Sequence, residues 1–331
     1  MVIGHSGCPI LVHNYVYTFQ VALFFMASGY CLKDKVINDL PIYCKKKLIG
    51  LWIPYIKWGI VFVLLHNLFY ELHLYDSLYG LMHIKYSLHD IVANIVRTTL
   101  FLQNEEPLLG GYWFIRELLF GSILSVILIR YLCNTKIVLL TLWTLAMILV
   151  WTKWKIPYFN LGFLTIYASL YFVSGYFTSQ TKLPTIPFWK NICLFFFIVC
   201  VSYFFPHPGV AETTKKTFAF YYPLSLVSVY VVWNFSQYIA LRNPRHVLCR
   251  FLSFIGRNTL IILTLHFLAF KFVSWLIVWV YDLDVRHIAD FPIIESYANC
   301  GWWFLYSIIG LALPIGYKIA RNKLRDIICI H

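Results

Sequence analysis

The sequence predicts an all-α, polytopic integral membrane protein, and three observations carry that prediction. Of the 331 residues, 60% are hydrophobic and only 12% are charged, whereas a soluble domain carries about 25% charged residues. The apolar residues gather in continuous runs long enough to cross a bilayer as helices. Basic residues concentrate in alternate connections between these runs. These features exclude an ordinary soluble enzyme, a disordered chain and a disulfide scaffold.

Nine complete apolar runs are predicted to cross the membrane, because a helix satisfies its backbone hydrogen bonds internally. The runs are continuously apolar rather than alternating, which excludes the strands of a barrel. The predicted spans are 12–32, 48–70, 113–132, 137–152, 160–177, 188–205, 218–241, 259–281 and 301–320.

Residues 1–10 precede the first complete run and are interpreted as the remnant of a tenth helix. They have neither the basic start nor the apolar stretch of a signal peptide. They also amount to about half of the roughly 20 residues that a span requires. We therefore expect residues 1–10 to pack as a stub within a single transmembrane domain, 1–331.

The distribution of charge sets the predicted orientation. With the connection after residue 32 placed inside, the inside segments hold 17 basic and three acidic residues, and the outside segments hold seven basic and ten acidic residues. This is the bias of the positive-inside rule. It accounts for the net charge of +13 without a nucleic-acid partner. A multi-pass protein of the cell membrane with a cytoplasmic C-terminus is predicted.

The longest outer connection, 71–112, is predicted to contain an amphipathic helix in the outer membrane interface. Apolar residues recur there at helical spacing: Leu88, Ile91, Val92, Ile95, Val96 and Leu100.

Four charged residues lie within predicted spans, where a charge costs about 2.5–3.5 kcal/mol on insertion scales and usually faces a cavity or a partner. They are Lys57, Arg116, Glu117 and Lys271. Snorkelling to the headgroups explains Lys57 and Arg116 equally well, whereas Lys271 is in the middle of its span. Arg116 and Glu117 are adjacent and point about 100° apart on one helix.

Histidines form the second polar signal: His5, His13, His66 and His266 lie in or beside spans. A neutral imidazole bonded to a neighbour explains most such residues. His5 differs because it stands in Gly-His-Ser-Gly, where small neighbours leave room for a ligand. With an ordinary pKa near 6.5, this imidazole is a candidate to take a proton from a hydroxyl.

Five segments together resemble the opening, middle and late motifs of the acyltransferase family 3 membrane proteins. The segments are Val-Ile-Gly-His at 2–5, Phe-Phe-Met-Ala-Ser-Gly-Tyr at 24–30, Lys-Lys-Lys-Leu at 45–48 leading to Ile-Pro-Tyr at 53–55, Tyr-Trp-Phe-Ile-Arg at 112–116, and Phe-Ile-Gly-Arg-Asn-Thr-Leu at 254–260 followed by His266. The resemblance runs along the whole chain in the family's order.

The resemblance implies a multi-span enzyme that moves an acyl group, often acetyl, from acyl-CoA to a hydroxyl of a cell-surface glycan or glycolipid. No bound cofactor and no metal is implied, because acyl-CoA is a substrate. His5 matches the family histidine. Family members carry an Arg upstream of this histidine, and that stretch is absent here. The sequence therefore predicts either a start before Met1 or a degenerate copy.

The site residues follow from the motifs and from the polar groups in the spans. His5 and Arg116 are the expected catalytic residues. His5 would act either as a general base or as the nucleophile of an acyl-histidine intermediate, and Arg116, alone or with Lys271, would stabilise the oxyanion or hold the donor. Lys45, Lys46 and Lys47 resemble the segment that meets acyl-CoA, although membrane anchoring explains them equally well. The residues expected to line the cavity are Trp113, Glu117, His266 and Lys271. Ser28 and Gly29 are assigned to close helix packing rather than to catalysis.

Two other function classes stay open. A glycosyltransferase that uses a lipid-phosphate sugar would require a metal-binding pair such as Asp282 and Asp284. A transporter or flippase would show broken helices in matching halves of the chain, and Pro54 and Pro314 do not form such a pair. The nine cysteines form no CxxC pair and are interpreted as small core residues.

Overall fold

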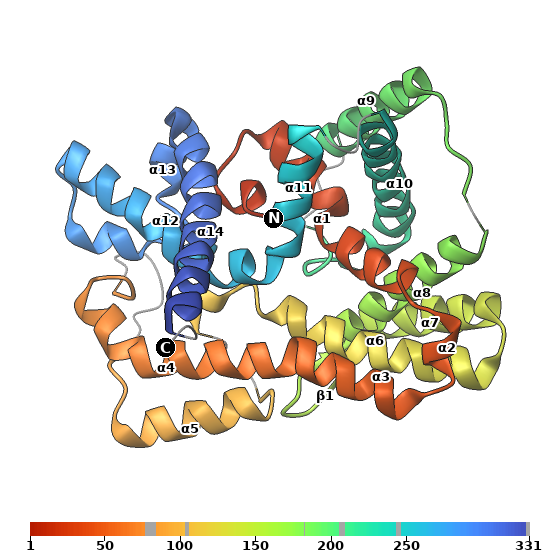
Figure 1. Ribbon diagram of the computed structural model, residues 1–331, viewed down its shortest axis with the longest axis horizontal. Helices are drawn as coiled ribbons and strands as arrows, with labels where there is room; N and C mark the ends of the chain where they lie inside the picture. Colours follow the sequence, from red (N-terminus) through yellow and green to blue (C-terminus); the bar gives the residue numbers. More distant parts are fainter. Residues whose placement is uncertain (77–83, 103–105, 182, 205–208, 243–245, 329–331) are drawn as a thin grey trace.

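The structure is a computed structural model that describes residues 1–76, 84–102, 106–181, 183–204, 209–242 and 246–328. The fold is all-α, as predicted, with one short antiparallel ladder (Figure 1). In chain order the elements are η1 (Ile3–His5), α1 (Ile10–Tyr30), α2 (Asp34–Ile37), α3 (Leu40–Lys47), η2 (Leu48–Trp52), α4 (Ile53–Glu71), α5 (Leu88–Thr99), η3 (Pro107–Leu109), α6 (Trp113–Leu132), α7 (Thr135–Thr152), β1 (Lys155–Ile156), β2 (Leu161–Gly162), α8 (Phe163–Thr181), α9 (Phe188–Phe204), α10 (Phe218–Arg242), α11 (Val247–Arg257), α12 (Thr259–Tyr281), η4 (Val285–Ala289), α13 (Glu295–Tyr297), η5 (Ala298–Trp302) and α14 (Trp303–Ile328).

A helix occupies each of the nine predicted segments, but not all nine meet the same test for crossing a membrane. Among the described residues, six helical stretches are long and apolar enough: α1, α3 to α4, α7, α10, α12 and α13 to α14. Helix α9 has 17 residues, and α6 and α8 carry more polar side chains. Membrane crossing by α6, α8 and α9 therefore stays a prediction.

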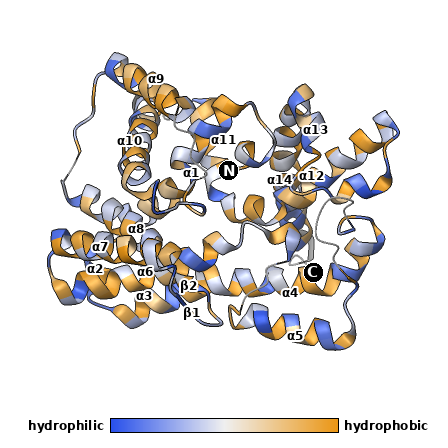
Figure 2. Ribbon diagram, turned by 180° about the vertical axis from the view of Figure 1, so that it is seen from behind, coloured by the Kyte–Doolittle hydropathy of each residue, from blue (hydrophilic) through white to orange (hydrophobic). Residues whose placement is uncertain are grey.

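The helices enclose two main hydrophobic clusters. One is formed largely by α4, α12 and α14 with the start of α6. The other is formed by α1, α7, α8 and α10 with the rest of α6. Helix α6 therefore joins the two halves. Figure 2 shows that the long helices are mainly hydrophobic and that hydrophilic residues gather near helix ends and in connections.

Helices α1 and α8 approach so closely that glycine is required on both. A Cβ atom on Gly29 of α1 would meet the carbonyl oxygen of Phe172, and a Cβ atom on Gly175 of α8 would meet the carbonyl oxygen of Met26, in each case closer than any real contact. Small residues permit this approach in membrane bundles. The expectation that Gly29 serves helix packing is confirmed.

Helix α5 lies along α4, and its polar side faces the protein. Its start is fixed by a capping box between Ser87 and Asp90. Thr98 packs against Gly59, and the indole nitrogen of Trp52 donates to the carbonyl of Thr99 at 3.3 Å. Leu88, Val92 and Val96 of α5 are exposed, whereas Ile91 and Ile95 are half-buried. This arrangement suits a lipid environment, and the depth of α5 in the membrane stays a prediction.

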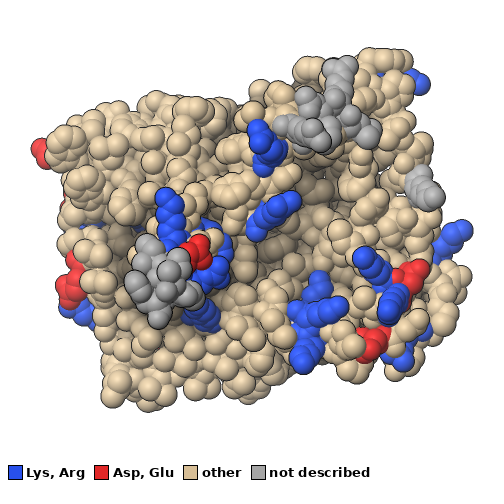
Figure 3. Space-filling view, in the orientation of Figure 1, with Lys and Arg blue, Asp and Glu red and all other residues tan. Residues whose placement is uncertain are grey.

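Lys and Arg outnumber Asp and Glu on the face of the molecule that is seen in Figure 3. The whole sequence has 27 Lys and Arg against 14 Asp and Glu, and the orientation of the chain in the membrane stays a prediction.

Substitution of Gly175 by Ala is expected to destabilise the protein by about 1–3 kcal/mol or more, because the added methyl must push two backbones apart. Gly256→Ala in α11 is the matched control. No atom lies within 4 Å of a Cβ built there, and Ala is favoured over Gly in a helix by about 0.5–1 kcal/mol. Thermal unfolding in detergent measures both. Equal effects of the two substitutions would contradict the close packing of α1 and α8.

Candidate active site

The N-terminal segment carries His5 into the space between α1, α12 and α14. The hydroxyl of Ser307 on α14 donates to the hydroxyl of Ser6 at 3.0 Å. Gly7 has a φ of +72°. A Cβ on Gly7 would lie 2.5 Å or less from side-chain atoms of Ile293 and Ala298. Both the backbone conformation and the close contact therefore require glycine at this position.

His5 lies beside a second histidine. Its ring centre is 5.8 Å from that of His266 and 5.2 Å from that of Phe267, both on α12. Its Nδ1 lies 3.3 Å from the hydroxyl of Tyr17 on α1. The ring of His5 is half-buried. Its contacts with one turn of α12 and with one side chain of α1 hold it in place.

His266 is fully buried, and its hydrogen bonds define its protonation. Nδ1 lies 3.0 Å and 2.9 Å from the carbonyl oxygens of Ile262 and Leu263. A carbonyl only accepts, so Nδ1 carries the proton and Nε2 holds a lone pair. Within the described residues, Nε2 has no hydrogen-bond partner. An unpaired buried acceptor costs about 1–3 kcal/mol, which marks this atom as one that a substrate proton would satisfy.

Lys271 is on the same helix and faces the protein. It is 3% exposed, and its ammonium donates to the carbonyl of Asp290 at 2.7 Å. The ammonium also lies 5.7 Å from the ring centre of Phe291, which is 4.7 Å from that of Phe267. Lys271 therefore borders the region that contains both histidines.

The start of α6 closes this region from another side. A Cβ on Gly111 would lie 2.8 Å from Leu263 and 3.9 Å from His266. The hydroxyls of Tyr112 and Thr264 are 2.8 Å apart. Trp113 follows and is half-buried. Gly111 and Tyr112 are therefore part of the wall beside His266, and the lining role of Trp113 stays a prediction.

Arg116 and Glu117 are buried, but their described contacts lead toward α8. The Nε of Arg116 donates to Oε1 of Glu117 at 3.1 Å, and the hydroxyl of Thr165 donates to Oε2 at 2.6 Å. Arg116 is 5% exposed and Glu117 is 0% exposed. The two positions point about 100° apart on the helix, yet both side chains are long enough to bend together.

The three lysines of the basic run are not grouped. Lys45 and Lys46 are exposed on α3. Lys47 turns inward, where its ammonium donates to the hydroxyl of Ser28 at 3.0 Å and lies 5.7 Å from the ring centre of Phe172. Binding of acyl-CoA by this run stays a prediction, and Lys47 has a separate packing role.

The sequence did not predict the contacts of a second buried histidine, His66. Nδ1 of His66 lies 2.9 Å from Oε2 of Glu106, to which the hydroxyl of Tyr75 also donates at 3.2 Å. Nε2 of His66 lies 3.2 Å from the carbonyl of Ile84. Burial and the carboxylate of Glu106 raise the pKa of Tyr75 above its ordinary value. Both ring nitrogens are occupied, so this cluster fastens the outer connection to α4.

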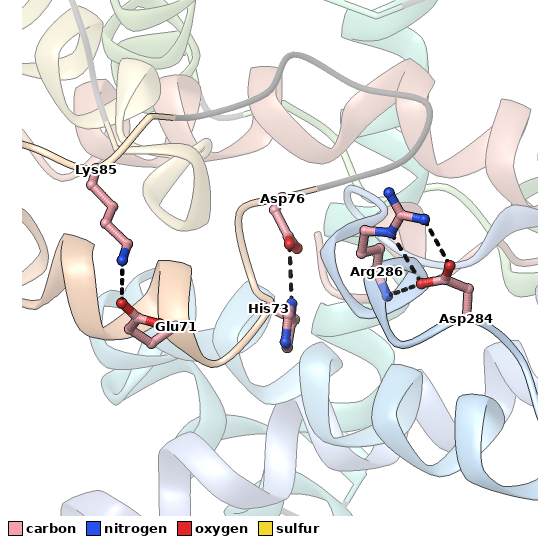
Figure 4. Close-up of polar contacts among 6 residues, drawn as sticks. All are labelled: Glu71, His73, Asp76, Lys85, Asp284 and Arg286. Atoms are coloured by element: carbon pink, nitrogen blue, oxygen red, sulfur yellow. Dashed lines mark hydrogen bonds and ion pairs between the residues drawn. The ribbon is translucent and has the colours of Figure 1, made fainter.

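The carboxylates required for the glycosyltransferase alternative are engaged elsewhere. Asp284 accepts two hydrogen bonds from the guanidinium of Arg286, at 3.2 Å and 2.9 Å (Figure 4). These bonds lower the pKa of Asp284 to about 2. Asp282 ends α12 in the left-handed conformation. Within the described part of the chain, no group of three or more His, Cys, Asp or Glu residues could hold a metal ion.

Arg116→Ala is expected to destabilise the protein by about 3–5 kcal/mol, because it leaves the carboxylate of Glu117 buried without its cation. Arg130→Ala, on the exposed end of the same helix, is the matched control and should be nearly neutral. Adding Glu117→Gln to Arg116→Ala should restore much of the loss. Thermal unfolding tests all three, and an unaltered unfolding temperature for Arg116→Ala would contradict the buried pairing of Arg116 with Glu117.

Comparison with known proteins identifies the family of the chain but no individual relative. No curated protein and no solved structure matches the chain. The family model that is described as an acyltransferase domain matches residues 1–321. This match covers nearly the whole chain and includes every motif that carries the resemblance. The chain therefore belongs to the acyltransferase family 3 and is a multi-pass membrane acyltransferase.

Proposed function

We propose that this acyltransferase moves an acyl group, most simply acetyl, from acyl-CoA to a hydroxyl of a cell-surface glycan or glycolipid. The observation that carries the proposal is the pair of imidazoles at His5 and His266. Both are held by contacts on their rings, and Nε2 of His266 is buried without a hydrogen-bond partner among the described residues. Such a pair suits the removal of a proton from an alcohol.

In the proposed step His5 acts as the general base. When the hydroxyl of Tyr17 accepts from Nδ1 of His5, Nε2 of His5 is free to take the proton of the acceptor hydroxyl. The alkoxide oxygen then attacks the thioester carbonyl carbon, a new C–O bond forms and the C–S bond breaks. The sulfur leaves and takes the proton back from the imidazolium, so that an ester and a free thiol result.

Lys271 is the better placed cation for the oxyanion. An ammonium has three donors, and Lys271 uses one on the carbonyl of Asp290. Preorganised donors of this kind stabilise charge that develops in the transition state. Arg116 is instead proposed to hold the bundle together through Glu117 and Thr165.

The acceptor is proposed to be a sugar because aromatic side chains border the site. Phe291 is 48% exposed beside Lys271, and Trp113, half-buried at the start of α6, is predicted to line the same site. Flat apolar rings pack well against the carbon faces of sugars. No metal or bound cofactor enters the proposed step.

His5→Ala is expected to abolish acyl transfer without loss of folding, because it removes the proposed base from a half-buried position. The measurement is transfer of labelled acetyl from acetyl-CoA to a mixed glycan and glycolipid fraction by the purified full chain. His89→Ala is the matched control, since His89 is exposed at the start of α5. Full activity of His5→Ala would remove His5 from the mechanism.

A further inference from the structure

A basic pocket lies between α4, α14 and the junction of α11 with α12. It has a volume of about 330 Å³. Four cations line it: Lys57 of α4, Arg257 at the end of α11, and Lys318 and Arg321 of α14. No Asp or Glu is among its lining residues. We refer to this cavity as the basic pocket.

The four cations are not explained by structural ion pairs. Within the described residues, none of the four forms an ion pair with a carboxylate. They come from three separate helices and converge on one hollow. Lys318 and Arg321 are three residues apart and share one face of α14. General attraction to the membrane surface would scatter cations over the inside connections, as Lys45 and Lys46 are, and would not require a cavity.

Two further features of the pocket favour an anion. Leu260 and Ile261, at the start of α12, line the pocket, so the positive end of a 23-residue helix faces it. Trp58 and Asn258 also line the pocket, together with Ile53 and Pro54. Several cations match the charge of a phosphate or pyrophosphate. The indole of Trp58 offers in addition a flat surface on which a nucleic-acid base can stack, whatever the base.

We infer that the basic pocket binds the phosphate groups of a ligand from the side of the membrane that is predicted to be cytoplasmic. Coenzyme A and an anionic phospholipid share this chemistry, and Trp58 favours the nucleotide end of coenzyme A. This inference rests on the proposed function for its choice of acyl donor. Ile261 lines the pocket and His266 follows five residues later, a rise of roughly 7 Å along α12. The pocket and the histidine pair therefore lie at neighbouring levels of the same helix.

Binding of coenzyme A, which carries no acyl group, tests the inference without turnover. The full chain is placed in phosphatidylcholine nanodiscs and titrated with labelled coenzyme A. Arg257→Gln and Lys318→Gln should each weaken binding at least tenfold, whereas Arg257→Lys should retain most of it. Lys136→Gln is the matched control, because Lys136 is an exposed cation at the start of α7. Lys46→Gln tests the competing basic run and should have no effect.

A second arm identifies the source of the phosphate. Retention of phosphatidylglycerol by the same variants is counted by native mass spectrometry. Loss of coenzyme A binding alone assigns the pocket to the acyl donor, and loss of phosphatidylglycerol alone assigns it to a lipid headgroup. Either of these two results supports a phosphate site in the pocket. The inference is overturned if neither ligand binds the wild type, or if the pocket variants and Lys136→Gln behave alike with both.

The test separates this inference from the proposed function. His5→Ala should bind coenzyme A as well as the wild type does. If binding depends on the pocket but no hydroxyl compound accepts acetyl, the proposed function fails and the pocket remains a phosphate site. If Arg257→Gln and Lys318→Gln transfer acyl groups with an unchanged KM for acyl-CoA, the pocket is excluded as the binding site of the donor. The proposed function then stands.

Discussion

The placement of His5 depends on how closely the N-terminal segment can enter between α1, α12 and α14. Gly7 has a left-handed backbone and leaves no room for a Cβ beside Ile293 and Ala298. Ser6 is fully buried and bonded to Ser307. A larger residue at either position would move the segment away from α12. The distance of 5.8 Å between the rings of His5 and His266 therefore follows from the packing of their small neighbours.

The polar groups in the bundle divide into those that are paired and those that are left open. Arg116, Glu117 and Thr165 satisfy one another, and His66 and Glu106 do the same. Such groups are costly to bury and are tolerated because they are bonded. Nε2 of His266 lacks a partner among the described residues. Within the same part of the chain, Oε1 of Gln20 and Oδ1 of Asn191 lack partners as well, so the open Nε2 supports a reaction centre only together with the neighbouring imidazole of His5.

Local signals in the sequence predicted the helices and the family well. A helix occupies every segment that run length and charge predicted, and the bounds of α6 and α12 match the predicted ones. Contacts between distant segments could not be predicted in the same way. Glu106 is one of the acidic residues of the predicted outer connection, and no residue near it in the sequence indicates its bond to His66, 40 residues away. The basic pocket unites three helices, so its cations looked like separate anchoring charges.

The most direct measurement of the central claim is a double-mutant cycle on the rate of acyl transfer with His5→Gln and His266→Gln. If the two imidazoles form one reaction centre, each single substitution removes most of the activity, and the double variant is scarcely worse than the more damaged single variant. If the two losses multiply, the histidines act independently. That result would contradict a shared site at the contact between the N-terminal segment and α12.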